Sequence, residues 1–247
     1  MEFEKEIQKL QDMIEESNNI VFFGGAGVST ESNIPDFRSS SGVFQEAHKY
    51  SPEQIVSHSF FLQNTKGFYE FYKSKMMFLE AQPNKAHMKL AELERCGKVK
   101  AVVTQNIDGL HQKAGSKNVL ELHGSIHRNH CQRCHTFYDA TYVKYAEGVP
   151  KCSACGGIIK PDVVLYEEGL NQEVMQNTIK AISRADMLII GGTSLVVYPA
   201  AGFIDYFREK KLVVINKTMT SRDKEAKLCI KGPIGEILGE INTASWN

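Results

Sequence analysis

The chain has no excess of charge of either sign and no long apolar run. It carries 29 Lys and Arg residues against 29 Asp and Glu residues in 247 positions. A formal net charge of zero gives no broad field to hold a phosphate backbone, so we expect no nucleic acid as the main partner. No stretch approaches the roughly 20 apolar residues of a membrane span, so we expect no membrane partner either.

The start of the chain lacks the order of a secretory leader, in which basic residues precede an apolar run. Residues 1–6 are acidic overall, and we therefore expect a cytoplasmic protein. Only six cysteines are present, and thiols stay reduced in that compartment. We interpret them as metal ligands or core residues, and not as disulfides.

Short apolar runs alternate with helical patterns along most of the chain. Apolar residues recur every three or four positions from Phe3 to Ile14, which is typical of a helix. Five runs rich in Val, Ile and Leu predict buried strands, and helical patterns lie between most of them. The strands are expected at 20–23, 99–103, 119–122, 187–190 and 212–215, and later helices at 83–97, 171–183 and 199–211. The alternation predicts an α/β fold with a doubly wound parallel sheet and sites at the carboxyl ends of its strands.

Two stretches interrupt this alternation. Residues 36–66 have no strong period and are predicted to form a long loop with one or two short helices, a typical lid. Residues 127–160 hold four of the six cysteines and little apolar material. The second stretch therefore predicts a small inserted module with its own source of stability.

The four cysteines of that module form two CxxC pairs. Cys131 and Cys134 are separated from Cys152 and Cys155 by 17 residues, a spacing typical of one tetrahedral zinc site. His130 and His135 flank the first pair and compete as ligands, but the four cysteines are the better-spaced set. Four thiolates leave no open position, so we predict a structural zinc ion and not a catalytic one.

Two turns rich in small residues follow predicted strands, at 24–30 and 191–194. Each lets a backbone approach a phosphate, although the first one alone is equally consistent with a simple tight turn. Together they favour a nucleotide site. No acidic residue ends a strand about 20 residues after the first turn, where a dehydrogenase would bind its ribose, so hydride transfer is disfavoured.

Polar residues follow two further predicted strands. Thr104–Asp108 lies where an α/β sheet places its ligands, or else Asp108 simply caps the next helix. His123 ends the strand at 119–122, a suitable place for a general base, although single histidines are more often structural.

The order of these motifs resembles the sirtuins, NAD-dependent protein lysine deacylases, and most of all their compact bacterial members. The resemblance runs from about Ile20 to Asn216. It rests on Gly25–Ser29, Ile34–Arg38, Thr104–Asp108, His123-Gly124, both CxxC pairs and Gly192–Leu195.

This resemblance implies a Rossmann-like NAD-binding domain formed by residues 1–126 and 161–247, with a zinc-ribbon domain at 127–160. The loop at 36–66 would contribute to the small domain or lid. The zinc ligands would be Cys131, Cys134, Cys152 and Cys155. The implied cofactor-binding residues are Ala26, Thr30, Phe37, Arg38, Gln105, Ile107, Asp108, His123, Thr193, Ser194, Asn216 and Ile234.

The resemblance also implies an activity, the NAD-dependent deacetylation of acetyl-lysine in proteins or peptides. Nicotinamide, deacylated lysine and O-acetyl-ADP-ribose would be the products. His123 would be the base, while Asn106 and Asp108 would orient the carboxamide and a water molecule. A mono-ADP-ribosyltransferase and a sensor of NAD or ADP-ribose without turnover remain alternatives.

Three residues depart from the family pattern, and the first is Gly24, which stands where the family usually has Thr. Asn33 stands where Gly is frequent, and Asn is the residue that best replaces Gly in a left-handed conformation. Glu167 follows the aromatic Tyr166, where the family usually has Gly. We expect this side chain to affect the preference for peptides and not the chemistry.

Overall fold

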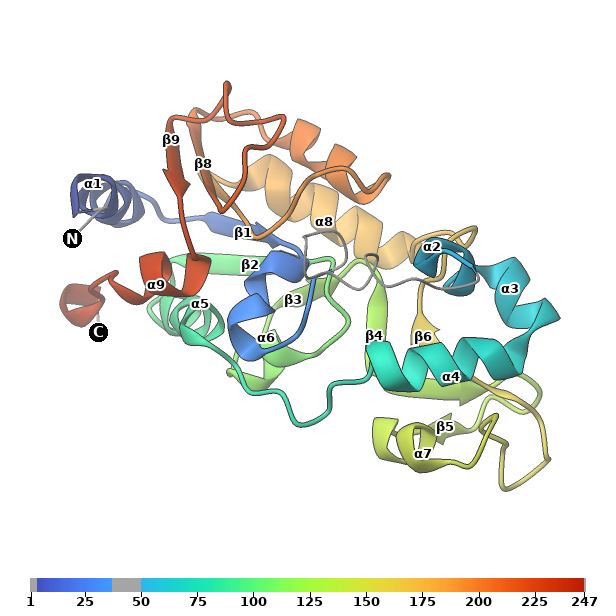
Figure 1. Cartoon of the computed structure of the whole chain (residues 1–247). Helices are drawn as coiled ribbons and strands as arrows, with labels where there is room; N and C mark the ends of the chain where they lie inside the picture. Colours follow the sequence, from blue (N-terminus) through green and yellow to red (C-terminus); the bar gives the residue numbers. More distant parts are fainter. Residues whose placement is uncertain (1–3, 37–49, 247) are drawn as a thin grey trace.

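Two sheets organise the residues that this computed structural model describes, 4–36 and 50–246 (Figure 1). The larger sheet has six parallel strands in the order β3-β2-β1-β7-β8-β9. The smaller sheet is antiparallel, with β4 between β5 and β6. The predicted doubly wound parallel sheet is confirmed.

The middle of the large sheet is the place where its winding reverses. From β1 the chain continues outward through β2 and β3, and then returns to β7 beside β1 and continues through β8 and β9. In sheets of this type, ligands bind outside the carboxyl ends of the strands at that reversal. The strands are β1 Ile20–Gly24, β2 Val99–Thr104, β3 Val119–Glu121, β7 Met187–Gly191, β8 Lys211–Asn216 and β9 Leu228–Lys231.

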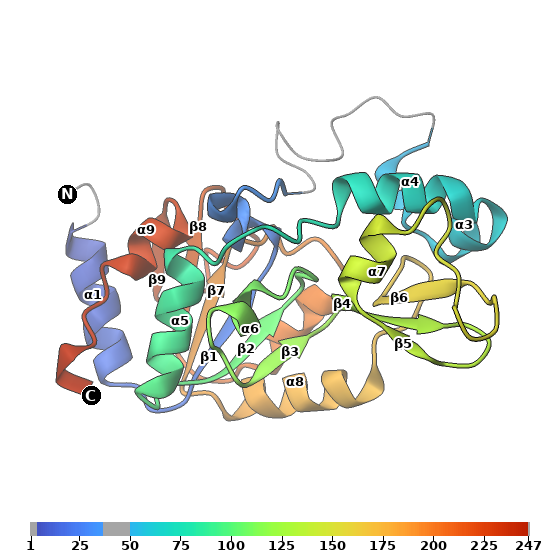
Figure 2. The same cartoon turned by 90° about the horizontal axis from the view of Figure 1, so that it is seen from below.

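Helices cover both faces of this sheet (Figure 2). On one face, α1 (Glu4–Glu15), α5 (Lys85–Arg95) and α9 (Ile234–Gly239) bury apolar side chains against Phe22 and Ile189. On the other face, α8 (Gln172–Arg184) and a 3-10 helix (Ala200–Tyr206) pack against Phe23 and Ile190. Burying both faces explains why the strands are nearly continuous apolar runs.

Three expectations about the elements need correction. The helix predicted at 199–211 is a shorter 3-10 helix, because Lys211 instead begins β8 opposite Met187. The strand predicted at 119–122 ends one residue earlier, at Glu121. The edge strand β9 was not predicted, since its four residues alternate buried and exposed and form no apolar run.

The small sheet shares its core with a helix at His58–Gln63, within the stretch expected to be a loop with one or two short helices, and with the next helix, Thr65–Lys75. Phe61, Phe68 and Tyr69 pack with Ile126 and Ile159 in one apolar cluster. The small strands are β4 Gly124–Cys131, β5 Phe137–Tyr138 and β6 Ile159–Val163. The helices are α2 Pro52–Ile55, α3 His58–Gln63, α4 Thr65–Lys75 and α7 Ala140–Tyr145. The division at 126/127 and 160/161 stays a prediction, and this shared core supports a small domain that includes α3 and α4.

Two lysines fasten α4 to α7 across this small region. The Lys73 ammonium donates to the carbonyl oxygens of Ala146 and Gly148, just beyond α7. The Lys144 ammonium donates in return to the carbonyls of Lys73 and Met77 at the end of α4. Cations at helix C-termini satisfy carbonyl groups that lack intrahelical partners.

No helix in the part of the chain described by the structure is long and apolar enough to cross a bilayer.

Candidate active site and metal centre

The two small-residue turns meet at the ends of the central strands β1 and β7. The Gly27 N–H donates to the Gly192 carbonyl at 2.8 Å. A Cβ on Gly27 would lie 2.8 Å from Gly192 Cα, so a larger residue would push the turns apart. Ala26 and Thr30, both predicted to bind the cofactor, lie in 3-10 helices that follow β1. The loops therefore form a close-packed backbone surface at the reversal of the sheet.

A chain of hydrogen bonds joins the end of β2 to this surface. Gln105 donates to Thr193 Oγ1 at 3.0 Å, and Asn106 donates to Ser29 Oγ at 3.1 Å. The Ser29 hydroxyl donates in turn to Asp108 Oδ2 at 2.7 Å. The other oxygen of Asp108 accepts the Leu110 N–H at the start of α6 (Leu110–Lys113). The Asp108 carboxylate is therefore bound both to the first N–H of α6 and to the polar cluster.

His123 is held at the same edge in one tautomer. Its Nδ1 lies 2.9 Å from the Gln105 carbonyl oxygen, and because a carbonyl only accepts, Nδ1 carries the proton. In the neutral ring Nε2 is then the basic nitrogen. Burial lowers the pKa of His123, and the hydrogen bond to the Gln105 carbonyl opposes that effect in part. The ring is consequently neutral near pH 7, as a general base must be.

The remaining predicted cofactor residues have different surroundings. Asn216, at the end of β8, donates to the Thr193 carbonyl at 3.1 Å, and Ser194 is exposed beside it. Ile107 is partly buried against the core of the small sheet. Ile234 is only 3% exposed and packs in the core beneath Gly191, so its role at the adenine stays a prediction. Phe37 and Arg38 lie outside the described residues.

Two residues of this site were not among the predicted functional residues. Ser29 links Asn106 to Asp108, although the sequence shows it only as part of the glycine-rich motif. His127 Nε2 lies 3.0 Å from the Asp108 carbonyl, and a Cβ on Gly109 would lie 2.7 Å from its ring. No spacing in the sequence connects β4 to this loop. Asn33 adopts the expected left-handed conformation, with φ of 61°.

The four cysteines of the CxxC pairs converge on one point, with all Sγ atoms within 4.8 Å of one another. Tetrahedral zinc with Zn–S bonds of about 2.3 Å needs sulfur atoms about 3.8 Å apart, and three Sγ pairs here are 3.4 to 3.5 Å apart. Tyr138 donates to Cys152 Sγ, and a Cβ on Gly157 would lie 2.8 Å from Cys131 Sγ. The donor set fits a structural zinc ion; His130 and His135 are not members of the cluster.

Comparison with known families identifies the origin of this arrangement. The family model described as the Sir2 family matches residues 25–199, from the first glycine turn to the residue after Tyr198. The chain belongs to the Sir2 family. This match spans the glycine turns, the polar cluster, His123 and all four cysteines, whereas Asn216 and Ile234 lie beyond the matched residues.

Individual relatives align with this chain over nearly its full length. The chain is 61% identical to a protein of Clostridium perfringens (strain 13 / Type A) described as an NAD-dependent protein deacetylase, over 95% of this chain and 98% of that one. A solved structure of a Sir2 histidine-to-alanine variant with a deacetylated p53 peptide and 3′-O-acetyl-ADP-ribose has a TM-score of 0.87 at 38% identity, covering 94% and 96% of the two chains. A Sir2 complex with p53 peptide and NAD+ has a TM-score of 0.83 at 38% identity, covering 94% and 95%.

Proposed function

We propose that this chain is an NAD-dependent protein deacetylase that acts on acetyl-lysine in proteins. The observation that carries the proposal is the position of His123: a neutral imidazole whose basic Nε2 is left available, beside a polar cluster at the reversal of a doubly wound sheet. The relative from Clostridium perfringens, with 61% identity, bears this activity in its description.

The glycine turns and the polar cluster suit NAD. The glycine-rich turn that contains Ala26 would face the pyrophosphate, and Thr193, Ser194 and Asn216 present polar groups at the neighbouring strand ends. Asn106 and Asp108, fastened together through Ser29, would hold the carboxamide of the nicotinamide. NAD, when bound, supplies the ADP-ribose group that accepts the acyl group.

His123 would accept the proton of a hydroxyl group in this site. Its Nδ1–H bond to Gln105 holds the ring plane and leaves Nε2 as the acceptor, so a deprotonated base is present without any rearrangement. The zinc centre lies at the far end of the strand that begins beside His123 and supplies stability, not chemistry. We place the activity in the cytoplasm, where the four thiols stay reduced for zinc.

The competing assignment is a mono-ADP-ribosyltransferase, which would keep the same base and pocket. Mass analysis of all products from NAD and an acetyl-lysine peptide separates the two. A deacetylase yields deacetylated peptide, nicotinamide and O-acetyl-ADP-ribose in equal amounts. A transferase yields a peptide or protein that carries ADP-ribose and keeps its acetyl group, and that result would refute the proposal.

A further inference from the structure

The segment that follows β6 connects the backbone of His123 to helix α3. The Val164 N–H donates to the His123 carbonyl at 3.0 Å. Two residues later, the Tyr166 N–H donates to the Val56 carbonyl at 3.0 Å, and the Tyr166 carbonyl accepts the His58 N–H at 2.9 Å. The segment is therefore hydrogen-bonded both to the backbone of His123 and to the first residue of α3.

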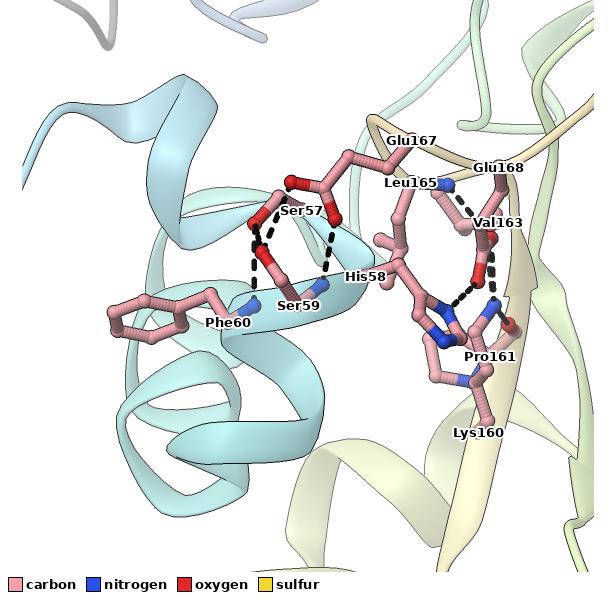
Figure 3. A network of polar contacts seen from close by, with 10 residues as sticks. All are labelled: Ser57, His58, Ser59, Phe60, Lys160, Pro161, Val163, Leu165, Glu167 and Glu168. Carbon is pink, nitrogen blue, oxygen red and sulfur yellow. Dashed lines mark hydrogen bonds and ion pairs between the residues drawn. The ribbon is translucent and has the colours of Figure 1, made fainter.

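Glu167 continues the segment in a conformation that glycine adopts more easily. Its φ is 76°, in the left-handed region where a side chain is strained. The carboxylate accepts the Ser59 N–H at 2.8 Å and the Ser59 hydroxyl at 2.9 Å (Figure 3). Ser59 lies in the first turn of α3, where N–H groups lack helical partners and a negative charge is stabilising. The side chain thus offsets the strain of its own backbone.

Glu168 is directed to the opposite side of the segment. Its carboxylate lies 2.8 Å from His58 Nδ1 and 3.1 Å from the Lys160 ammonium on β6, and it also accepts the Leu165 N–H at 2.9 Å (Figure 3). Burial works against the charge of Glu168, but the Leu165 N–H, His58 and Lys160 together lower its pKa. The two consecutive carboxylates therefore bind the segment to α3 and to β6 at once.

We propose that Glu167 and Glu168 form a clamp that sets the position of Val164–Tyr166 beside His123, and that Glu167 is thereby a positioning residue for the acetyl-lysine peptide. This inference rests on the proposed function. Between the clamp and His123, Tyr166 is 39% exposed and Val164 is partly exposed, so the held backbone presents side chains to an arriving peptide. The carboxylate of Glu167 is hydrogen-bonded to the Ser59 N–H and the Ser59 hydroxyl, which belong neither to His123 nor to the polar cluster.

The clamp predicts a separation of kinetic constants in Glu167→Ala. Losing a hydrogen-bonded carboxylate should raise KM for the acetyl-peptide roughly ten-fold, with kcat and KM for NAD nearly unchanged. Ser59→Ala removes part of the same contact. The double variant Glu167→Ala/Ser59→Ala should therefore raise peptide KM by much less than the product of the two single effects. Glu147→Gln, at an exposed carboxylate of the same small region, is the matched control and should match the wild type.

Glu167→Gly distinguishes the clamp from backbone strain. Glycine relieves the left-handed strain but cannot bind Ser59, so the clamp predicts that peptide KM stays high in this variant. A Gly variant with wild-type peptide KM, an unchanged KM in Glu167→Ala, or additive effects with Ser59→Ala would overturn the proposal.

Hydrogen exchange tests the clamp without turnover. The amides of Ser59 and Tyr166 should be protected in the wild type and exchange faster in Glu167→Ala and Glu167→Gly, but not in Glu147→Gln. Wild-type protein that shows this protection but no turnover would count against the proposed function alone. Equal exchange in all four proteins would count against the clamp alone.

Discussion

At the scale of single residues, His123 is the proposed general base. Replacing it by Ala removes the base while leaving the Gln105 carbonyl and the rest of the polar cluster in place. Because a positioned base contributes about 10²- to 10⁴-fold, kcat for deacetylation should fall by that factor. Binding of NAD, measured by calorimetry, should change little. A folded variant with nearly normal turnover would remove His123 from the mechanism.

The pH dependence tests the same residue in the wild type. A base must be neutral to accept a proton, so kcat/KM should rise as His123 loses its proton and then reach a plateau. Burial is the main cause that lowers the pKa of this ring from its usual value of 6.5, and kcat/KM reports the free enzyme. The acidic limb should therefore lie below pH 6.5. A limb above that value in the wild type would contradict the assigned environment.

At the scale of elements, strand β4 connects the predicted base to the metal centre. It begins at Gly124, next to His123, and ends at the predicted zinc ligand Cys131. Zinc binding stabilises small modules of this kind by an amount on the order of 10 kcal/mol, and its removal should unfold the small sheet and displace the base.

Metal analysis of the purified protein should find about one zinc per chain. A strong chelator, or Cys152→Ser, should abolish both the metal and the activity, and far-ultraviolet circular dichroism should report the loss of structure. The exposed Cys229→Ser, whose side chain lies outside the cysteine cluster, provides the control and should keep both. Full activity in metal-free protein would show that the cluster has another role.

The elements also show how far the sequence alone could predict this molecule. The central strands are recognisable because burial on both faces requires continuous apolar residues, and the CxxC spacing predicts the convergence of the four cysteines directly. Strand β9 is not predicted because an edge strand with one exposed face needs only alternating buried and exposed side chains. The contacts of Ser29 and His127 with Asp108 are not predictable from spacing either. Each depends on tertiary proximity, because Ser29 lies 79 positions and His127 19 positions from Asp108 in the sequence.

At the scale of the whole molecule, two buried histidines make stability depend on pH. The rings of His87 and His111 lie 4.7 Å apart between α5 and α6, at 0% and 1% exposure. Burial lowers the pKa of His87 from 6.5 to about 4, although Asp108 opposes this, and burial also lowers the pKa of His111. The unfolded chain therefore binds protons that the folded chain does not.

Because the pKa values of these histidines are lower in the folded state, their neutral forms contribute fully to the free energy of unfolding above pH 6.5. This contribution is lost as the pH falls toward about 4. The contribution of His87 alone is on the order of 3 kcal/mol. Denaturant unfolding should give a lower free energy of unfolding near pH 5 than at neutral pH. Replacing both histidines by Asn should reduce the slope of this free energy against pH. Equal slopes in the wild type and the double variant would show that other groups cause it.

Loss of the acetyl group should be coupled to consumption of NAD. This coupling is measured by following one acetyl-lysine peptide with and without NAD and counting the nicotinamide released for each acetyl group lost. We expect no reaction without NAD, one nicotinamide per acetyl group with it, and transfer of the acetyl group to ADP-ribose. Deacetylation in the absence of NAD, or release of nicotinamide while the peptide keeps its acetyl group, would contradict it.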